Sequence, residues 1–181
     1  MSNVIAGVVR GQFPYLEEHI AQKKAIYERY KKGLQGLPIH MNPYDVTNTE
    51  PNFWLSCMII EPKAMCKQVC GGLEALYIGE AGKSCPTEIL DAIASINAEG
   101  RPIWKPMHMQ PIYRMNAFVT REANGRAKTN AYISGGELGK DGKPLDVGMD
   151  IFHRGLCLPS DNKMTAEQQN RIIEVIKECF A

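Results

Sequence analysis

The sequence predicts an α+β domain, a two-layer α/β sandwich in which helices cover one face of a small sheet. A long stripe of apolar residues at helical spacing follows the N-terminus, and a second stripe ends the chain. Between them lie a few short apolar runs that are typical of strands. Few strands interleaved with helices favour this architecture. The 181 residues suit one domain, residues 1–181.

The N-terminal part predicts two consecutive helices. Ser2 or Asn3 can cap a first helix over about residues 4–12, and Pro14 is allowed in the first turn of a second. Glutamates near the start of the second helix and lysines near its end suit the helix dipole. Its apolar residues recur at steps of three, four and seven, which predicts one packed face: Leu16, Ile20, Tyr27, Tyr30 and Leu34.

The middle of the chain predicts a strand, a helix and a second strand. Residues 53–61 form an apolar run between two prolines, as a strand does. Residues 87–99 show a helical stripe that Gly100 ends. The short strand over 101–104 contains Pro102, which predicts an edge strand or a strand start because proline has no N–H for a sheet ladder.

The C-terminal part predicts a polar irregular segment, a strand and a helix. Turn signals flank residues 120–143, and residues 156–159 form another short apolar run. Thr165 and Gln168 form a capping box at the start of the last helix. The buried stripe of that helix is predicted to contain Ile172, Ile173, Ile176, Cys179 and Phe180.

Composition excludes several classes of protein. The net charge of +1 argues against a nucleic-acid binder, and 44% hydrophobic residues argue against a disordered chain. No run is apolar for long enough to span a bilayer, and the N-terminus lacks a secretory signal, so we expect no membrane partner. Six scattered cysteines without a secretory signal predict reduced thiols and a cytoplasmic location. Two of them, Cys57 and Cys157, fall within apolar runs and are expected to be small buried hydrophobes.

Three chemical motifs are incomplete. Residues 79–84 end like a phosphate-binding loop, but Tyr77 occupies the position of the first glycine and no clear strand precedes it, so a plain loop is favoured over a nucleotide site. Cys66 and Cys70 would share a helix face, yet no zinc-binding spacing occurs. No Cys or Ser lies in a triad context, and structural or surface roles are favoured for His19, His40 and His153.

Residues 101–113 carry the strongest functional signal, and we call them the site segment. Arg101 and Lys105 supply cationic donors, Trp104 and Tyr113 supply flat aromatic faces, and His108 can donate or accept a proton. Three prolines restrict the backbone. This composition suits a pocket for an anionic, ring-bearing ligand, and it suits equally a stiff connector whose Trp and Met residues cover the core.

The stretches 1–12, 101–111 and 154–160 resemble the C-terminal half of the DegT/StrS sugar aminotransferases. Their order and spacing are most similar to the branch that aminates UDP-linked 4-keto-6-deoxy sugars for cell-surface polysaccharide or glycan biosynthesis. The resemblance covers essentially the whole chain. It implies the small C-terminal domain of a fold type I enzyme, with a long N-terminal helix and a mostly antiparallel sheet. It also implies pyridoxal phosphate (PLP) as cofactor, glutamate as amino donor and a homo-oligomer.

The resemblance also implies roles for individual residues. Ser2 and Asn3 match the segment that approaches the cofactor phosphate, so they are expected to bind the cofactor. Arg101, Trp104, Lys105 and His108 match the segment that lines the nucleotide-sugar side. The expected roles are diphosphate or carboxylate contact for Arg101 and Lys105, ring contact for Trp104, and polar lining for His108. No catalytic residue and no metal ligand is assigned.

The chain departs from the family in one respect. The family's cofactor lysine lies in a large N-terminal domain, in a segment with no counterpart here, and Met1 matches a position within a family motif. PLP chemistry requires a lysine and an acidic partner for the pyridine nitrogen. We therefore expect the chain alone to bind no PLP and to be inactive. The alternatives are a non-catalytic binding or dimerisation module, and a nucleotide-binding enzyme built on residues 79–84.

Overall fold

A computed structural model of the protein describes residues 1–71, 74–113, 142 and 146–181. The chain begins with two helices, α1 (Asn3–Gln12) and α2 (Leu16–Gly33), joined by the short 3-10 turn Phe13–Tyr15. Ser2 caps α1, because its Oγ accepts a hydrogen bond from the N–H of Ile5 at 3.3 Å. The two predicted helices and the capping residue are therefore confirmed.

The main sheet has four strands in the order β1 (Ile39–Met41), β2 (Ser56–Ile60), β6 (Gly155–Leu158) and β5 (Arg101–Pro102). Every neighbouring pair in it is antiparallel. The short strand β5 lies at the edge, where a proline does not interrupt a ladder. The predicted α+β class and the mostly antiparallel sheet are confirmed.

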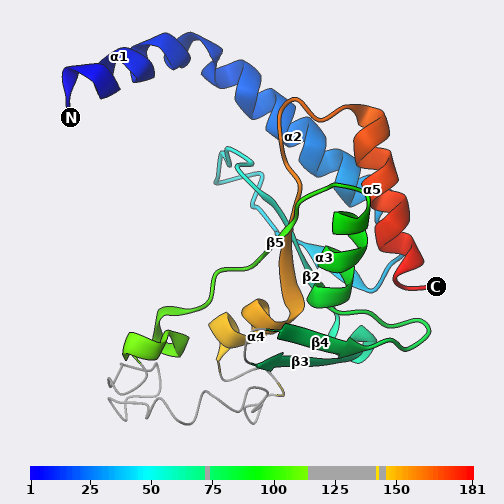
Figure 1. Ribbon diagram of the computed structural model, residues 1–181. Coiled ribbons are helices and arrows are strands. Elements are labelled where there is room, and N and C mark those ends of the chain that lie inside the picture. Colours follow the sequence, from blue (N-terminus) through cyan, green and yellow to red (C-terminus); the bar gives the residue numbers. More distant parts are fainter. Residues whose placement is uncertain (72–73, 114–141, 143–145) are drawn as a thin grey trace.

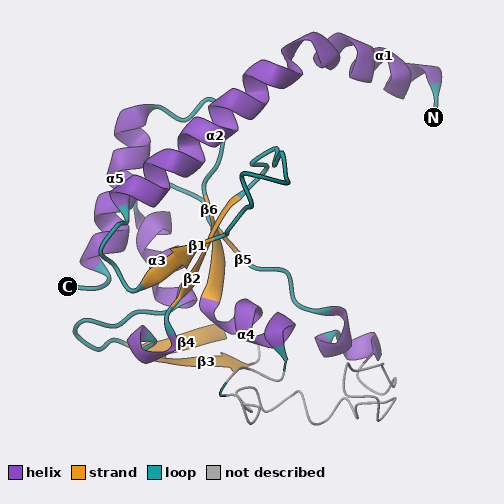
Figure 2. Ribbon diagram, turned by 180° about the vertical axis from the view of Figure 1, so that it is seen from behind, coloured by secondary structure: helices purple, strands orange, loops and turns teal. Residues whose placement is uncertain are grey.

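Helices α2, α3 (Pro86–Ser95) and α5 (Ala166–Glu178) cover one face of this sheet (Figures 1 and 2). The capping box predicted for α5 is present: Thr165 and Gln168 exchange side-chain to backbone hydrogen bonds. Burial of apolar side chains between the two layers stabilises the fold. Its core includes Tyr30, Leu34, Met58, Ile60, Ile89, Ile93, Leu156, Leu158, Ile172, Ile173 and Ile176.

Several short elements were missing from the sequence prediction. They are β1, the hairpin of β3 (Lys67–Gly71) and β4 (Glu74–Ile78), and helix α4 (Val147–Arg154). The interpretation of Cys66 and Cys70 as neighbours on a helix face is wrong, because residues 67–71 form a strand. The polar segment predicted over 120–143 lies outside the described residues, apart from Gly142. No helix that the structure describes has the length and hydropathy needed to cross a membrane.

Helix α4 is fixed to the sheet by its last residue. The Arg154 guanidinium donates to both carboxylate oxygens of Asp150, at 2.7 and 2.5 Å, and to the backbone carbonyl of Ile60 in β2. Gly155 follows at once and begins β6. The chain passes so closely here that a Cβ on Gly155 would lie 2.6 Å from the carbonyl oxygen of Ile151 and 2.8 Å from Cγ1 of Ile103.

We expect Gly155→Ala to lower the free energy of unfolding by about 1–3 kcal/mol, because the added methyl overlaps backbone that cannot rotate away. Gly7→Ala is the matched control, since nothing lies within 4 Å of the equivalent position in α1. That change should raise the free energy of unfolding by about 0.5–1 kcal/mol through helix propensity. Urea unfolding followed by circular dichroism measures both. Equal effects of the two substitutions would contradict the close approach at Gly155.

The Tyr30 side chain is buried, and its hydroxyl donates to the backbone carbonyl of Pro159 at 2.9 Å. Burial raises its pKa above the ordinary value of 10.0. The folded state therefore keeps this proton at a pH where the unfolded chain loses it, and stability falls as pH rises above about 10. Tyr30→Phe should cost about 1 kcal/mol at pH 7.

The difference between wild type and Tyr30→Phe should shrink above pH 10, because phenylalanine has no proton to lose. Urea unfolding at pH 7 and at pH 10.5 measures it. Tyr15→Phe is the control, since Tyr15 is exposed and should change stability little at either pH. A constant difference across this pH range would show that Tyr30 does not contribute to the alkaline loss of stability.

Candidate functional site

The site segment leaves the main sheet at its edge. Arg101 and Pro102 form β5, which pairs with β6 through the registers Arg101–Cys157 and Pro102–Leu156. The Arg101 side chain is 74% exposed, and its guanidinium forms an ion pair of 2.6 Å with the exposed Glu99. In Figure 1 the segment then runs away from the helical layer toward the lower left. The backbone of Arg101 is therefore fixed in the sheet, and its guanidinium is exposed to solvent.

Trp104 forms an aromatic pair with Trp54. The two ring centroids are 5.8 Å apart and the ring planes are inclined by 35°. Trp104 is 63% exposed, and Trp54 is exposed to a similar extent. These are the only two tryptophans of the sequence. Two exposed indoles next to each other offer a flat apolar surface on which a sugar or base ring can stack.

The sequence prediction missed Trp54, because it lies in an apolar run that was assigned to a strand. The strand begins only at Ser56, and Phe53 has a left-handed backbone with φ of 51°. Its ring packs against Tyr27 and Tyr44, with centroids 5.4 and 5.1 Å away. This aromatic cluster stabilises an unfavourable backbone conformation of Phe53, which costs of order 1–3 kcal/mol. Phe53 is thus buried while the next side chain, Trp54, is exposed.

His108 links the site segment to helix α4. Its Nε2 lies 2.5 Å from Oδ2 of Asp146, and the other oxygen of that carboxylate accepts from the N–H of Met149 at 3.0 Å. Asp146 is thus the N-cap of α4 and a partner of His108 at once. The His108 side chain is only 19% exposed. Asp146 was not identified from the sequence, because α4 was not predicted.

Lys105 is exposed between these two anchored positions. Its backbone carbonyl accepts a hydrogen bond from Nε2 of Gln110 at 3.2 Å, across the 3-10 turn Met107–Met109. A second 3-10 turn, Pro111–Tyr113, follows directly. The segment therefore has a defined path, and its four predicted ligand-binding residues lie within eight positions of each other.

The structure does not bring Ser2 and Asn3 to the site segment. They lie at the free end of α1, which extends away from the body of the molecule at the top of both ribbon views, whereas the site segment runs toward the bottom (Figures 1 and 2). By helix geometry the N–H groups of the first turn point out of the end of α1, and the Ser2 hydroxyl proton is available beside them. Such donors fit a phosphate group. They do not fit the ring of PLP, and no lysine among the described residues is buried.

The loop over residues 79–84 connects β4 to α3, so a strand does precede it, contrary to the sequence prediction. Its polar side chains have protein partners: Lys83 forms an ion pair of 2.6 Å with Glu80 in the loop, and the buried Ser84 donates to Glu88 in α3 at 2.7 Å. The missing first glycine and these internal contacts favour a structural loop. Within the described ranges, no three His, Cys, Asp or Glu side chains group as metal ligands.

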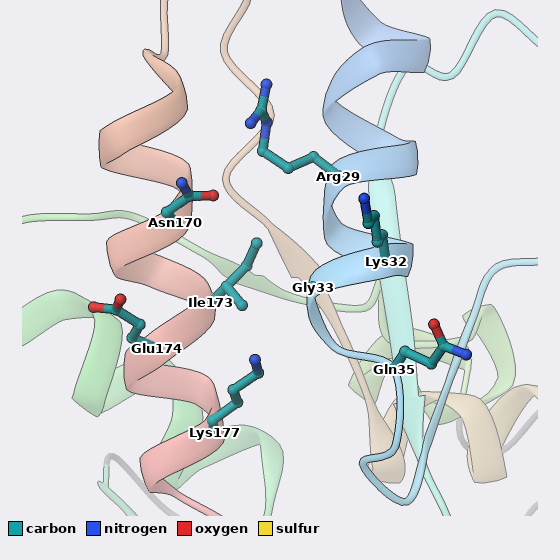
Figure 3. A pocket seen from close by; sticks show the side chains of 8 residues that line it. All are labelled: Arg29, Lys32, Gly33, Gln35, Asn170, Ile173, Glu174 and Lys177. Atoms are coloured by element: carbon teal, nitrogen blue, oxygen red, sulfur yellow. The ribbon is translucent and has the colours of Figure 1, made fainter.

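A groove of about 590 Å³ lies between α2 and α5, away from the site segment (Figure 3). Its floor is the close contact of the two helices, where Gly33 faces Ile173. Long side chains at its rim carry mixed charge and extend toward solvent. The groove is lined by Arg29, Lys32, Gly33, Gln35, Asn170, Ile173, Glu174 and Lys177. We attribute it to the helix packing rather than to a ligand site.

Comparison with known proteins places this geometry in a family. EpsN of Bacillus subtilis (strain 168), assigned as a pyridoxal phosphate-dependent aminotransferase, is 29% identical over 181 residues. The alignment covers 99% of this chain and 36% of EpsN, so the chain spans about a third of the length of that relative.

Two solved structures show the same fold. Spr1654 of Streptococcus pneumoniae, assigned as a sugar aminotransferase, superposes in its PMP form with a TM-score of 0.64 at 16% identity, covering 99% of this chain and 35% of that one. DesI, solved in the presence of its TDP-sugar product, superposes with a TM-score of 0.59 at 13% identity, covering 92% and 32%. The model of the DegT/DnrJ/EryC1/StrS aminotransferase family matches residues 1–134. The chain belongs to this family.

Proposed function

We propose that the chain is the small C-terminal domain of a PLP-dependent sugar aminotransferase, and that the site segment forms one wall of a nucleotide-sugar pocket. The observation that carries the proposal is the pair of Trp54 and Trp104, exposed beside the cations Arg101 and Lys105. The segment is held to α4 by His108, so its backbone path is already defined before a ligand arrives.

Each residue has a separate task in this proposal. The two indoles stack on a ring of the ligand, which removes apolar surface from water. Lys105 and Arg101 neutralise the diphosphate, Lys as a point charge and Arg as a planar fork with several donors. Arg101 then exchanges its exposed partner Glu99 for the ligand. His108 lines the pocket, and Asp146 fixes the orientation of its imidazole.

The cofactor is proposed to bind mainly to other parts of the polypeptide. When bound, PLP supplies the electron sink that allows an amino group to move between glutamate and a keto sugar. The chain's own contribution is the first turn of α1, where Ser2 and the N–H of Asn3 donate to the phosphate. The lysine and the acidic partner of the pyridine ring lie in the N-terminal domain. The chain alone is therefore expected to bind no PLP and to have no activity.

The relatives support this assignment at the level of chemistry. The chain's family consists of aminotransferases, and DesI was solved with a TDP-sugar. We propose a nucleotide-linked keto sugar as substrate and glutamate as amino donor, in the biosynthesis of a cell-surface polysaccharide or glycan. The enzyme would work in the cytoplasm as a homodimer with its active sites between subunits.

Because both tryptophans lie in the proposed pocket, intrinsic fluorescence reports on ligand binding there. We expect UDP to change the emission of the complete aminotransferase in a saturable way. Lys105→Ala should weaken UDP binding roughly tenfold, since hydrogen bonds to charged groups contribute about 1.5–3 kcal/mol. Lys63 is an exposed lysine in the 3-10 turn Pro62–Ala64, so Lys63→Ala is the matched control and should leave the affinity unchanged.

Amino transfer is tested with the same protein, a nucleotide-linked keto sugar and glutamate, with the amino sugar detected by mass spectrometry. An unchanged UDP affinity in Lys105→Ala would refute the role of Lys105. Thermal stabilisation by ATP that persists in Lys105→Ala and disappears in Lys83→Ala would favour instead a nucleotide site at residues 79–84.

A further inference from the structure

Two cysteines face each other across the central strands of the sheet. The register of β2 and β6 pairs Cys57 directly with Cys157. Directly paired residues point to the same face of a sheet, and their neighbours Met58 and Leu156 belong to the core under the helices. Both thiols therefore lie on the opposite face, which α2, α3 and α5 leave uncovered. Arg101 is the partner of Cys157 on the other side, so its side chain continues the same row.

The backbone hydrogen bonds show which kind of pair this is. The N–H of Cys57 donates to Oδ1 of Asn42 at 2.9 Å, and its carbonyl accepts from the N–H of Asn42 at 2.9 Å. The backbone N–H and carbonyl of Cys57 thus both point toward Asn42, the residue that follows β1, and away from β6. Cys57 and Cys157 consequently form a non-hydrogen-bonded pair, in which the Cα atoms are about 4.5 Å apart and side chains are closest. This separation lies within the range of about 4.4–6.8 Å that disulfides span.

The two sulfur atoms are already in contact. The Sγ of Cys57 donates to the Sγ of Cys157 at 3.5 Å. This hydrogen bond holds the pKa of Cys157 below its usual value and raises the pKa of Cys57, so Cys157 is the first of the two to become a thiolate. Cys157 is only 3% exposed, whereas Cys57 is half-buried and gives solvent access to the pair.

We propose that Cys57 and Cys157 are a reversible redox site, which a peroxide closes to a disulfide and a dithiol reopens. The thiolate of Cys157 attacks a peroxide oxygen, the O–O bond breaks, and hydroxide leaves and takes a proton from solvent. The sulfenic acid that results has lost two electrons to the peroxide. The Cys57 sulfur then attacks the Cys157 sulfur; the S–O bond breaks, the thiol proton goes to the departing hydroxide, and water leaves. A dithiol restores both thiols by exchange.

The disulfide would join two residues that lie 100 positions apart in the sequence. Such a bond stabilises the protein chiefly because it restricts the unfolded chain. It would also connect two strands that carry the proposed pocket. Trp54 lies just before β2, and Arg101 pairs with Cys157 in β6. Cytoplasmic disulfides of ordinary proteins are usually transient and redox-sensing, which suits a reversible pair.

The other described thiols have less favourable environments. Burial raises the pKa of Cys85 to about 12, and it also raises the pKa of its buried neighbour Cys66. Cys179 donates to the carbonyl of Val175 within α5, and burial raises its pKa to about 11. A raised thiol pKa lowers the thiolate fraction that reacts with peroxide.

The test is treatment of the purified chain with hydrogen peroxide at neutral pH, followed by blocking of free thiols and peptide mapping by mass spectrometry. We expect loss of two of the six thiols, a peptide that contains Cys57 bonded to Cys157, and full reversal by dithiothreitol. Oxidation should raise the melting temperature by roughly 5 °C or more. The wild-type map is decisive by itself and does not require a variant to fold.

Cys57→Ser should abolish both the two-thiol loss and the thermal shift, because Cys57 supplies the second sulfur. Cys179→Ser is the matched control, a half-buried cysteine on another element, and should keep both effects. The proposal is overturned if the bonded peptide links other cysteines, if Cys57→Ser still loses two thiols, or if peroxide takes Cys157 to a sulfinic acid without forming the bridge.

Discussion

The fold depends on the pairing of β2 with β6. These strands are about a hundred residues apart in sequence, yet they form the centre of the main sheet and carry apolar side chains on the face that meets the helices. Met58 and Ile60 from β2 pack with Leu156 and Leu158 from β6 against α2 and α5. A contact between such distant segments has a high loop-closure entropy, so it forms only because the helices bury this surface at the same time.

The position of the site segment follows from that pairing. Because β6 lies in the middle, its free edge receives β5 and so fixes where the segment begins. The end of α4 is tied to β2 through Arg154, and its N-terminus binds His108 through Asp146. The site segment is therefore attached at two points, at Arg101 to the sheet and at His108 to helix α4. The cations and the indole between these points remain exposed to solvent.

The sequence predicted the elements whose stabilising pattern is local. The caps at Ser2 and Thr165 and the buried stripe over Ile172, Ile173 and Ile176 lie where they were expected. The predicted stripe of α2 is confirmed at Tyr27, Tyr30 and Leu34 and is wrong at the start of the helix, where Leu16 is 45% exposed. The hairpin of β3 and β4, strand β1 and helix α4 were missed, because each is short and has too few apolar positions for a period to show. Helix α4 in addition depends on a distant contact, the hydrogen bond from Arg154 to the carbonyl of Ile60 in β2.

The candidate site divides in the same way. The sequence singles out Arg101, Trp104, Lys105 and His108 because they lie close together in one proline-rich stretch. Their partners Trp54 and Asp146 come from 50 residues before Trp104 and 38 residues after His108, and no local pattern connects them. The register that sets Cys57 against Cys157 was equally invisible, since it requires the pairing of β2 with β6. In each case the sequence shows the residue, but its partner is known only once the fold brings distant segments together.

Helix α1 is favoured by its own sequence but lacks a packed face in the part of the chain that the structure describes. Its cap and its apolar residues favour a helix, but none of its residues is buried among the described parts of the chain. An isolated helix of ten residues is only marginally stable in water. The connection of α1 to the rest of the described fold is the 3-10 turn that leads into α2. Exposed apolar side chains on such a helix usually mark an interface. The remainder of a sugar aminotransferase would supply the covering surface, which is why the exposed face of α1 supports the proposed larger enzyme. The members of this face include Val4, Ile5, Val8 and Val9.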